Sequence, residues 1–135
     1  MITPETAPPG TIIAVRVGTI WHEGIVSDRR DADRLPMVIN KSKRSRRVEE
    51  EPFRIFAPRW SRTRVIGYPS RLPRELVLER ARARIGEPWS LEHNCERFCR
   101  SVHDRRGRAG RSPTIELIGT IGGLLLSGLG RAVRT

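Results

Sequence analysis

The sequence has few cysteines, almost no lysine and no recognisable targeting segment, and these shortages exclude several classes of protein. Two cysteines in 135 residues are too few for a disulfide framework. Cys95 and Cys99 are one helical turn apart, a spacing that does not suit a disulfide within an intact helix. The first ten residues contain neither a basic start nor an apolar run, so we expect no signal peptide. We therefore expect a single domain in the reducing environment of the cytoplasm.

Arginine supplies nearly all of the positive charge. All but two of the 26 basic residues are arginine, and with 15 acidic residues they give a formal net charge of +11. Such an excess is typical of proteins that bind nucleic acids or anionic membranes. Here the arginines are scattered along the whole sequence, and no nucleic-acid-binding signature accompanies them. We therefore expect no specific nucleic-acid partner.

Apolar patterning predicts strands in the first half of the chain and helices in the second. Runs rich in β-branched residues predict strands over 11–17, 20–27, 37–42 and 63–68. Residues 1–8 read as a flexible lead-in and 28–36 as a loop, whereas a helix is expected from Ser70 to Gly86. This order predicts an α+β domain over residues 9–104, with a small antiparallel sheet packed against helices.

Cys95 lies in the most informative stretch, which runs from Gly86 to Val102. Pro88 interrupts the preceding helix, and Ser90 is expected to cap the next one. Cys95 would then lie about one turn inside that helix, where the helix dipole lowers the pKa of a thiol and favours the thiolate. The alternative is that Cys95 is a core residue, as most cysteines on an apolar helix face are.

A cysteine nucleophile also needs a base and a polar group that orients the base. His93 and His103 lie at unsuitable positions along the helix of Cys95, which leaves His22 on the second predicted strand. Asn40, an amide in an otherwise apolar strand, is the candidate orienting group. Each residue also has a structural interpretation, His22 as a buried strand histidine and Asn40 as a turn former. A cysteine on a helix, facing a histidine and an amide on a sheet, is the papain-type arrangement.

Two motifs resemble those of one protein family. Trp21–Asp28, WHEGIVSD, resembles the His-x-Gly-Ile box of the lecithin retinol acyltransferase-like (LRAT domain) proteins, and Asn94–Phe98 resembles their Asn-Cys-Glu-His-Phe box. Pro9-Gly10 resembles the start of that domain, and Val38–Ser42 the segment with the second polar triad residue. The resemblance implies a circularly permuted papain-like fold, related to NlpC-type hydrolases, in which the histidine precedes the cysteine.

The resemblance also implies a function. Cys95 would be the nucleophile, His22 the base and Asn40 the orienting residue of a thiol hydrolase or acyltransferase. The acyl donor would be a lipid ester, such as a phospholipid, or an amide, and no cofactor or metal is expected. The alternative is a non-catalytic module, membrane-associated or protein-binding, that has retained the papain-like scaffold.

The last segment has a different character. We expect an Arg/Gly linker over 105–112 and an apolar C-terminal helix over 113–135. Thr114–Leu129 has sixteen residues and a single charge, which is short against the ~20 residues that span a bilayer. The helix is therefore expected either to associate with a membrane or to pack on the domain or on a second copy. Small residues at four-residue spacing favour self-association, and these are Gly119, Gly123 and Ser127.

Overall fold

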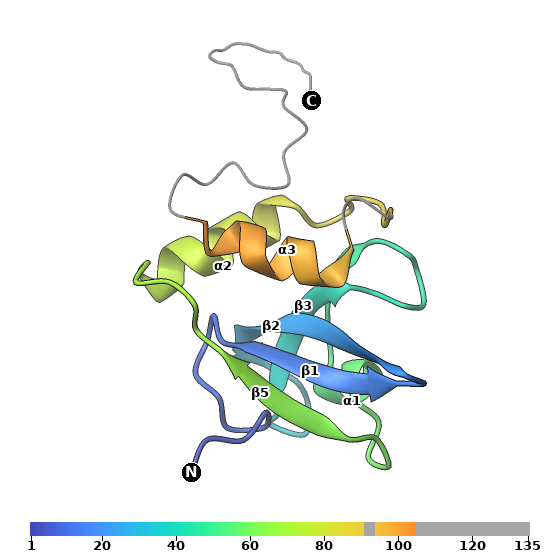
Figure 1. Cartoon of the computed structure of the whole chain (residues 1–135). Helices are drawn as coiled ribbons and strands as arrows, with labels where there is room; N and C mark the ends of the chain where they lie inside the picture. The colour runs from blue at the N-terminus through green and yellow to red at the C-terminus, as the bar shows by residue number, and fades with distance from the viewer. Residues whose placement is uncertain (91–93, 105–135) are drawn as a thin grey trace, which may run out of the picture.

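The computed structural model describes residues 1–90 and 94–104, and in these ranges five antiparallel strands form one sheet. The strands are β1 (Ile12–Val17), β2 (Ile20–Arg30), β3 (Pro36–Lys41), β4 (Val48–Glu51) and β5 (Thr63–Gly67). Their order across the sheet is β4-β3-β2-β1-β5 (Figure 1). The expected antiparallel sheet is confirmed, and β2 lies at its centre.

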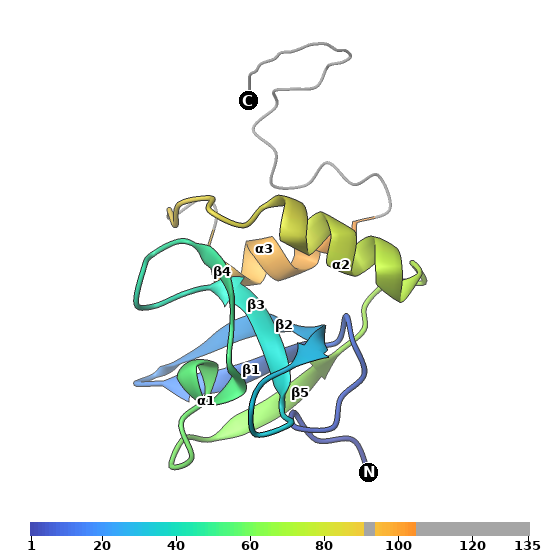
Figure 2. The same cartoon turned by 180° about the vertical axis from the view of Figure 1, so that it is seen from behind.

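Helices cover both faces of this sheet. They are α1 (Phe53–Phe56), α2 (Arg74–Ala83) and α3 (Cys95–Val102). Figures 1 and 2 show α2 and α3 together on one side of the sheet and α1 on the other. The α+β class expected from the sequence is therefore confirmed.

The alternation of side chains along the strands supplies two apolar layers. On the face covered by α2 and α3, Ile12, Ile25 and Ile39 pack in a cluster with Phe98 and Cys99. The opposite face packs against α1 in a cluster of Ile13, Val15, Val26, Val38, Phe53 and Phe56, with Ala7 and Ala57. The sheet is thus buried on both sides, and it holds the side chains of β2 and β3 in fixed positions.

Several boundaries differ from the sequence prediction. The loop expected over 28–36 is shorter, because β2 continues to Arg30 and pairs there with Pro36. Helix α2 begins after Pro73, not at Ser70, because the backbone of Pro73 is extended and the helix cannot include the residues before it. β4 and α1 occupy a stretch to which the sequence analysis assigned neither a strand nor a helix.

The expectations for the C-terminal segment are not tested. The linker (105–112), the apolar helix (113–135), the stretch Thr114–Leu129 and the small residues within it all lie outside the described residues. Within residues 1–90 and 94–104, none of the helices has the length and apolar character needed to cross a bilayer.

Candidate active site

Cys95 is the first residue of α3. The helix is capped by Asn94 and not by Ser90 as expected, because the Asn94 side-chain oxygen accepts a hydrogen bond from the Arg97 backbone N–H at 2.9 Å. The Cys95 sulfur is half-buried and accepts the backbone N–H of Glu23 at 3.5 Å. The start of α3 therefore holds the thiol against β2, beside the residue that follows His22.

His22 and Asn40 are joined by a hydrogen bond between neighbouring strands. The distance from His22 Nε2 to Asn40 Oδ1 is 3.0 Å, and both side chains are buried. The Asn40 side-chain nitrogen donates to the Glu51 carboxylate at 3.1 Å. Because a carboxylate only accepts, this bond turns the amide oxygen toward His22. His22 then carries its proton on Nε2, and Nδ1 is the free basic nitrogen of the neutral ring.

Gly24 makes room for this pair. It lies opposite Asn40 in the register of β2 and β3. A Cβ atom at Gly24 would come within 2.6 Å of Val38 Cγ1, 2.9 Å of Phe56 Cε1 and 3.1 Å of Asn40 Cβ. The Phe56 ring also packs against the His22 ring, with centroids 5.5 Å apart. The glycine two residues after His22 is therefore needed for close packing around the site.

Cys95 and His22 line the same cavity, which has a volume of about 600 Å³. Trp21 and Trp89 supply large apolar walls, and the guanidinium of Arg46 lies 4.9 Å from the centre of the Trp89 ring. A cavity of this size accommodates a small-molecule ligand or one end of a longer substrate.

Positive charge surrounds part of this cavity. Lys41 and Lys43 contribute to its lining, and the Lys41 side chain is fully buried. Its ammonium group donates to the Pro88 carbonyl at 3.1 Å and lies 3.3 Å from the Glu87 carboxylate. Burial lowers the pKa of Lys41, against the effect of Glu87. Lys41 thus ties β3 to the segment that precedes Cys95.

The pKa of the Cys95 thiol differs from the sequence expectation. Burial raises the pKa of Cys95, the nearby Glu23 carboxylate acts in the same direction, and the Glu23 backbone N–H opposes both. The expectation of a lowered thiol pKa is therefore wrong, because the N-terminal amides of α3 do not outweigh the desolvation. Burial also lowers the pKa of His22, against the effect of its hydrogen bond to Asn40. At neutral pH the cavity is accordingly lined by an uncharged thiol and an uncharged imidazole.

Of the three residues predicted from the sequence, two line one cavity and the third is hydrogen-bonded to one of them. Cys95 and His22 line the cavity, and Asn40 lies behind His22, to which it is hydrogen-bonded. Cys99, by contrast, is fully buried in the core. Glu51, which orients the Asn40 amide, was missed, although it is the last residue of an acidic run, VEEE, that follows the third strand.

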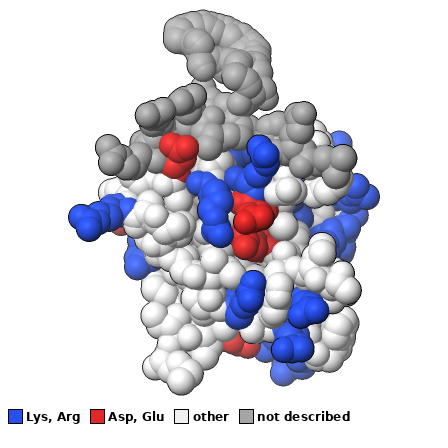
Figure 3. Space-filling view, in the orientation of Figure 1, with Lys and Arg blue, Asp and Glu red and all other residues white. Residues whose placement is uncertain are grey.

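The surface charge does not form one continuous basic patch on the face shown in Figure 3. Lysine and arginine side chains lie at several separate positions there, and acidic side chains lie among them near the centre of the view. The absence of a nucleic-acid partner stays a prediction.

Fold and site together define an α+β protein with a cysteine and a histidine at one cavity and an asparagine hydrogen-bonded to that histidine. No group of three or more His, Cys, Asp or Glu side chains within the described ranges is arranged to hold a metal ion. Comparison with known proteins adds no relative, because no family model, curated protein or solved structure matches the chain.

Proposed function

We propose that the protein is a cysteine-dependent acyl hydrolase or acyltransferase with a permuted papain-like arrangement, acting on a lipid ester or an amide. The observation that carries the proposal is the hydrogen bond from His22 Nε2 to Asn40 Oδ1, in a site where the half-buried Cys95 thiol accepts the backbone N–H of the next residue, Glu23. It leaves Nδ1 of His22 as the base in a cavity that Cys95 also lines.

In the proposed reaction, His22 Nδ1 takes the proton of the Cys95 thiol as the sulfur attacks the acyl carbon. The S–C bond forms, and the backbone N–H groups at the start of α3 stabilise the oxyanion. His22 then returns the proton to the leaving alcohol or amine as the C–O or C–N bond breaks. Water or an acceptor alcohol or amine finally attacks the thioester, with His22 again acting as the base.

The raised thiol pKa bears on the order of these steps. Because Cys95 is uncharged at neutral pH, deprotonation by His22 accompanies the attack on the substrate and does not precede it. Because its pKa is lowered, His22 is uncharged at neutral pH, and its Nδ1 can accept that proton. The site therefore works by general-base activation of a thiol, as serine hydrolases activate an alcohol.

The test is to trap the thioester on the full chain. Wild-type protein is incubated with p-nitrophenyl butyrate, and separately with micelles of dihexanoylphosphatidylcholine, and analysed by intact mass spectrometry and peptide mapping. We expect one acyl group on Cys95 that neutral hydroxylamine removes, as it removes thioesters but not oxygen esters. Cys95→Ala and His22→Ala abolish this adduct, whereas Cys99→Ala, which removes the other thiol, retains it.

A competing function is a non-catalytic module that retains the scaffold. The raised pKa of Cys95 is the observation that favours it, because an uncharged thiol packed against other residues is also typical of a structural cysteine. Absence of a hydroxylamine-sensitive adduct on Cys95 with both acyl donors, in a protein that remains folded, would support this alternative and overturn the first.

A further inference from the structure

A second buried histidine, His103, lies at the other end of α3 and is hydrogen-bonded to a serine. His103 caps the C-terminus of this helix, and its Nδ1 lies 2.6 Å from the Ser70 hydroxyl. His103 Nε2 lies 2.8 Å from the backbone carbonyl oxygen of Gly10. Ser70 belongs to the loop between β5 and α2, so three distant segments of the chain meet at this point.

The hydrogen bonds define which nitrogen is the base. A backbone carbonyl only accepts, so His103 Nε2 must carry the proton that it donates to Gly10. In the neutral ring, Nδ1 is then the acceptor, and the Ser70 hydroxyl donates to it. Burial lowers the pKa of His103, the hydrogen bond to Gly10 opposes it, and nearby arginines (Arg100, Arg74 and Arg80) lower the pKa further. As in His22, Nε2 is anchored and Nδ1 is the basic nitrogen, but in His103 that nitrogen already accepts a hydroxyl.

The ring of His103 is fixed in position. It is 5 % exposed, and Tyr68 packs edge-on against it with ring centroids 4.5 Å apart. Gly10, whose carbonyl anchors the ring, has a φ of +89°, and a Cβ atom there would come within 2.8 Å of the Tyr68 ring. The Gly10 carbonyl and the Tyr68 ring hold the imidazole, and its remaining nitrogen accepts a serine hydroxyl. This is the geometry of a catalytic serine–histidine dyad in which a carbonyl positions the histidine.

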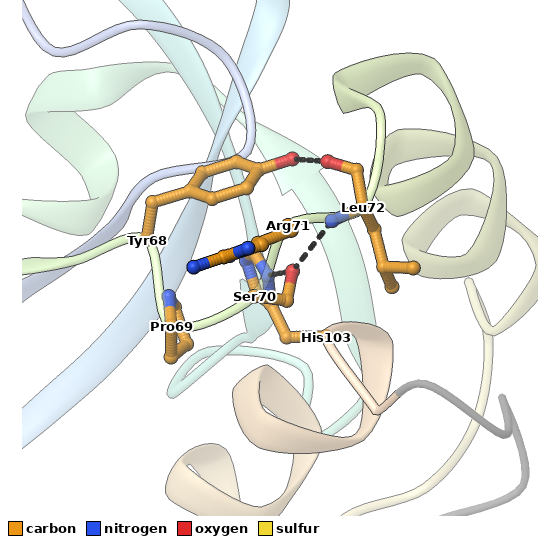
Figure 4. Close-up of a pocket in the computed structure, with 6 residues that line it drawn as sticks. All are labelled: Tyr68, Pro69, Ser70, Arg71, Leu72 and His103. Atoms are coloured by element: carbon orange, nitrogen blue, oxygen red, sulfur yellow. Dashed lines mark hydrogen bonds between the residues drawn. The ribbon is translucent and has the colours of Figure 1, made fainter.

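The serine is less buried than the histidine. Ser70 and His103 line a cavity of about 730 Å³ together with Tyr68, Pro69, Arg71 and Leu72 (Figure 4). The Leu72 backbone N–H donates to the Ser70 oxygen at 3.3 Å, which holds the hydroxyl in position. Arg71 brings a guanidinium to the same cavity, and Pro69 and Leu72 give it apolar surface.

We propose that Ser70 and His103, anchored by the Gly10 carbonyl, form a second, serine-dependent esterase site, selective for small carboxylic esters with an anionic group. His103 Nδ1 takes the hydroxyl proton as Ser70 Oγ forms a bond to the acyl carbon. The ester C–O bond breaks, and the leaving alcohol receives that proton from His103. Water, activated by the same nitrogen, then hydrolyses the acyl-serine and regenerates the hydroxyl. Arg71 pairs with the anionic group of the acyl part.

The first test is labelling of the full chain with a fluorophosphonate, in which Ser70 Oγ bonds to phosphorus and fluoride leaves. Peptide mapping of the wild-type protein is expected to place the label on Ser70. His103→Gln is expected to slow labelling about 100-fold, the scale of a lost general base. Ser61→Ala is the matched control, because Ser61 also donates its hydroxyl, but only to the Pro58 carbonyl and not to a histidine.

The second test addresses the substrate class. Acyl-serine formation is compared for p-nitrophenyl hydrogen succinate and p-nitrophenyl butyrate, whose acyl groups are of similar size but differ in charge. The adduct on Ser70 resists neutral hydroxylamine, which separates it from a thioester on Cys95. We expect faster acylation by the succinate ester, and we expect Arg71→Ala to abolish that preference.

Two results would overturn the proposal. A fluorophosphonate label that maps to another residue, or no label at Ser70 above the level at Ser61, would make the pair a structural link between the loop and α3. Equal acylation rates for the two esters would remove the assigned substrate class. Mapping in the wild-type protein decides the first question even if Ser70→Ala or His103→Gln fails to fold.

Discussion

The amide nitrogen of Asn40 donates to the carboxylate of Glu51 at 3.1 Å, and this bond determines which ring nitrogen of His22 carries the proton. With its nitrogen engaged, Asn40 presents only its oxygen to His22 Nε2. Glu51 also accepts hydrogen bonds from Ser42 and Arg44, so the carboxylate is held in place by three donors. Glu51 therefore acts on His22 through Asn40, as a positioning residue for the base of the candidate active site.

Glu51→Gln is expected to lower the pKa of His22 further. The negative charge of Glu51 favours the protonated imidazole and raises its pKa, so removal of that charge adds to the effect of burial. NMR titration of the imidazole measures the change directly. Glu49→Gln is the matched control, since Glu49 lies on the same strand but does not contribute to the pKa of His22. An unchanged titration in Glu51→Gln would show that Glu51 does not act on the ring.

Alkylation of Cys95 by iodoacetamide is expected to be slow at neutral pH and to accelerate in alkaline solution. Burial raises the pKa of the thiol, so the thiolate fraction at neutral pH is below that of a free cysteine. The rate is measured against pH in a Cys99→Ala background. A fast rate that stays constant from mildly acidic to neutral pH would indicate a preformed thiolate–imidazolium pair and contradict the prediction.

Gly24→Ala is expected to destabilise the fold by about 2 kcal/mol and to displace His22, because the added methyl overpacks a filled position. Its nearest contacts would be Val38 and Phe56, and Asn40 follows. Urea unfolding measures the free energy, and NMR chemical shifts of the imidazole report the displacement. Gly18→Ala is the control: it strains a turn with a φ of +61° but meets nothing within 4 Å, so the His22 signals stay in place.

The first half of the fold could be predicted because its strands follow a simple pattern. β1, β2, β3 and β5 are rich in β-branched residues, and their alternation sorts the two faces of the sheet. β4 was missed because its four residues are Val48 and three glutamates, one of which, Glu51, is buried. In a sequence, a glutamate indicates an exposed position unless its partners are known. Glu51 lies near Asn40 only because β3 pairs with β4.

The candidate site was predictable in its residues but not in its electrostatics. Cys95 was predicted from its place in a helix and His22 from the unsuitable positions of the other histidines. Asn40 was predicted as an amide in an apolar strand, and the family resemblance pointed to the same three residues. Whether the thiol pKa is raised or lowered depends on how deeply the start of α3 is packed against β2, and no local sequence pattern indicates that depth. The Ser70–His103 pair, separated by 33 residues, likewise arises from the packing of α3 against the loop before α2.

Arg82 links α2 to the sheet through two carboxylates. It lies 2.6 Å from Asp28 on β2 and 3.1 Å from Glu50 on β4, and the Glu50 side chain is only 7 % exposed. Burial alone would raise the pKa of Glu50, but hydrogen bonds from Arg82 and Ser27 hold it below the usual value of 4.5. Arg82→Met is therefore expected to leave a buried carboxylate poorly paired and to cost about 2 kcal/mol at neutral pH.

The cost of Arg82→Met should depend on pH in a defined direction. A lowered folded-state pKa contributes stability above the unfolded value of 4.5, and that contribution is lost as the pH falls through the folded pKa. The difference between wild type and Arg82→Met, measured by urea unfolding, should therefore shrink in acid, where Glu50 is protonated in both. Glu50→Gln/Arg82→Met should recover part of the loss, because no charge is left buried. An equal loss at neutral and acidic pH would mean that Arg82 stabilises the fold by packing alone.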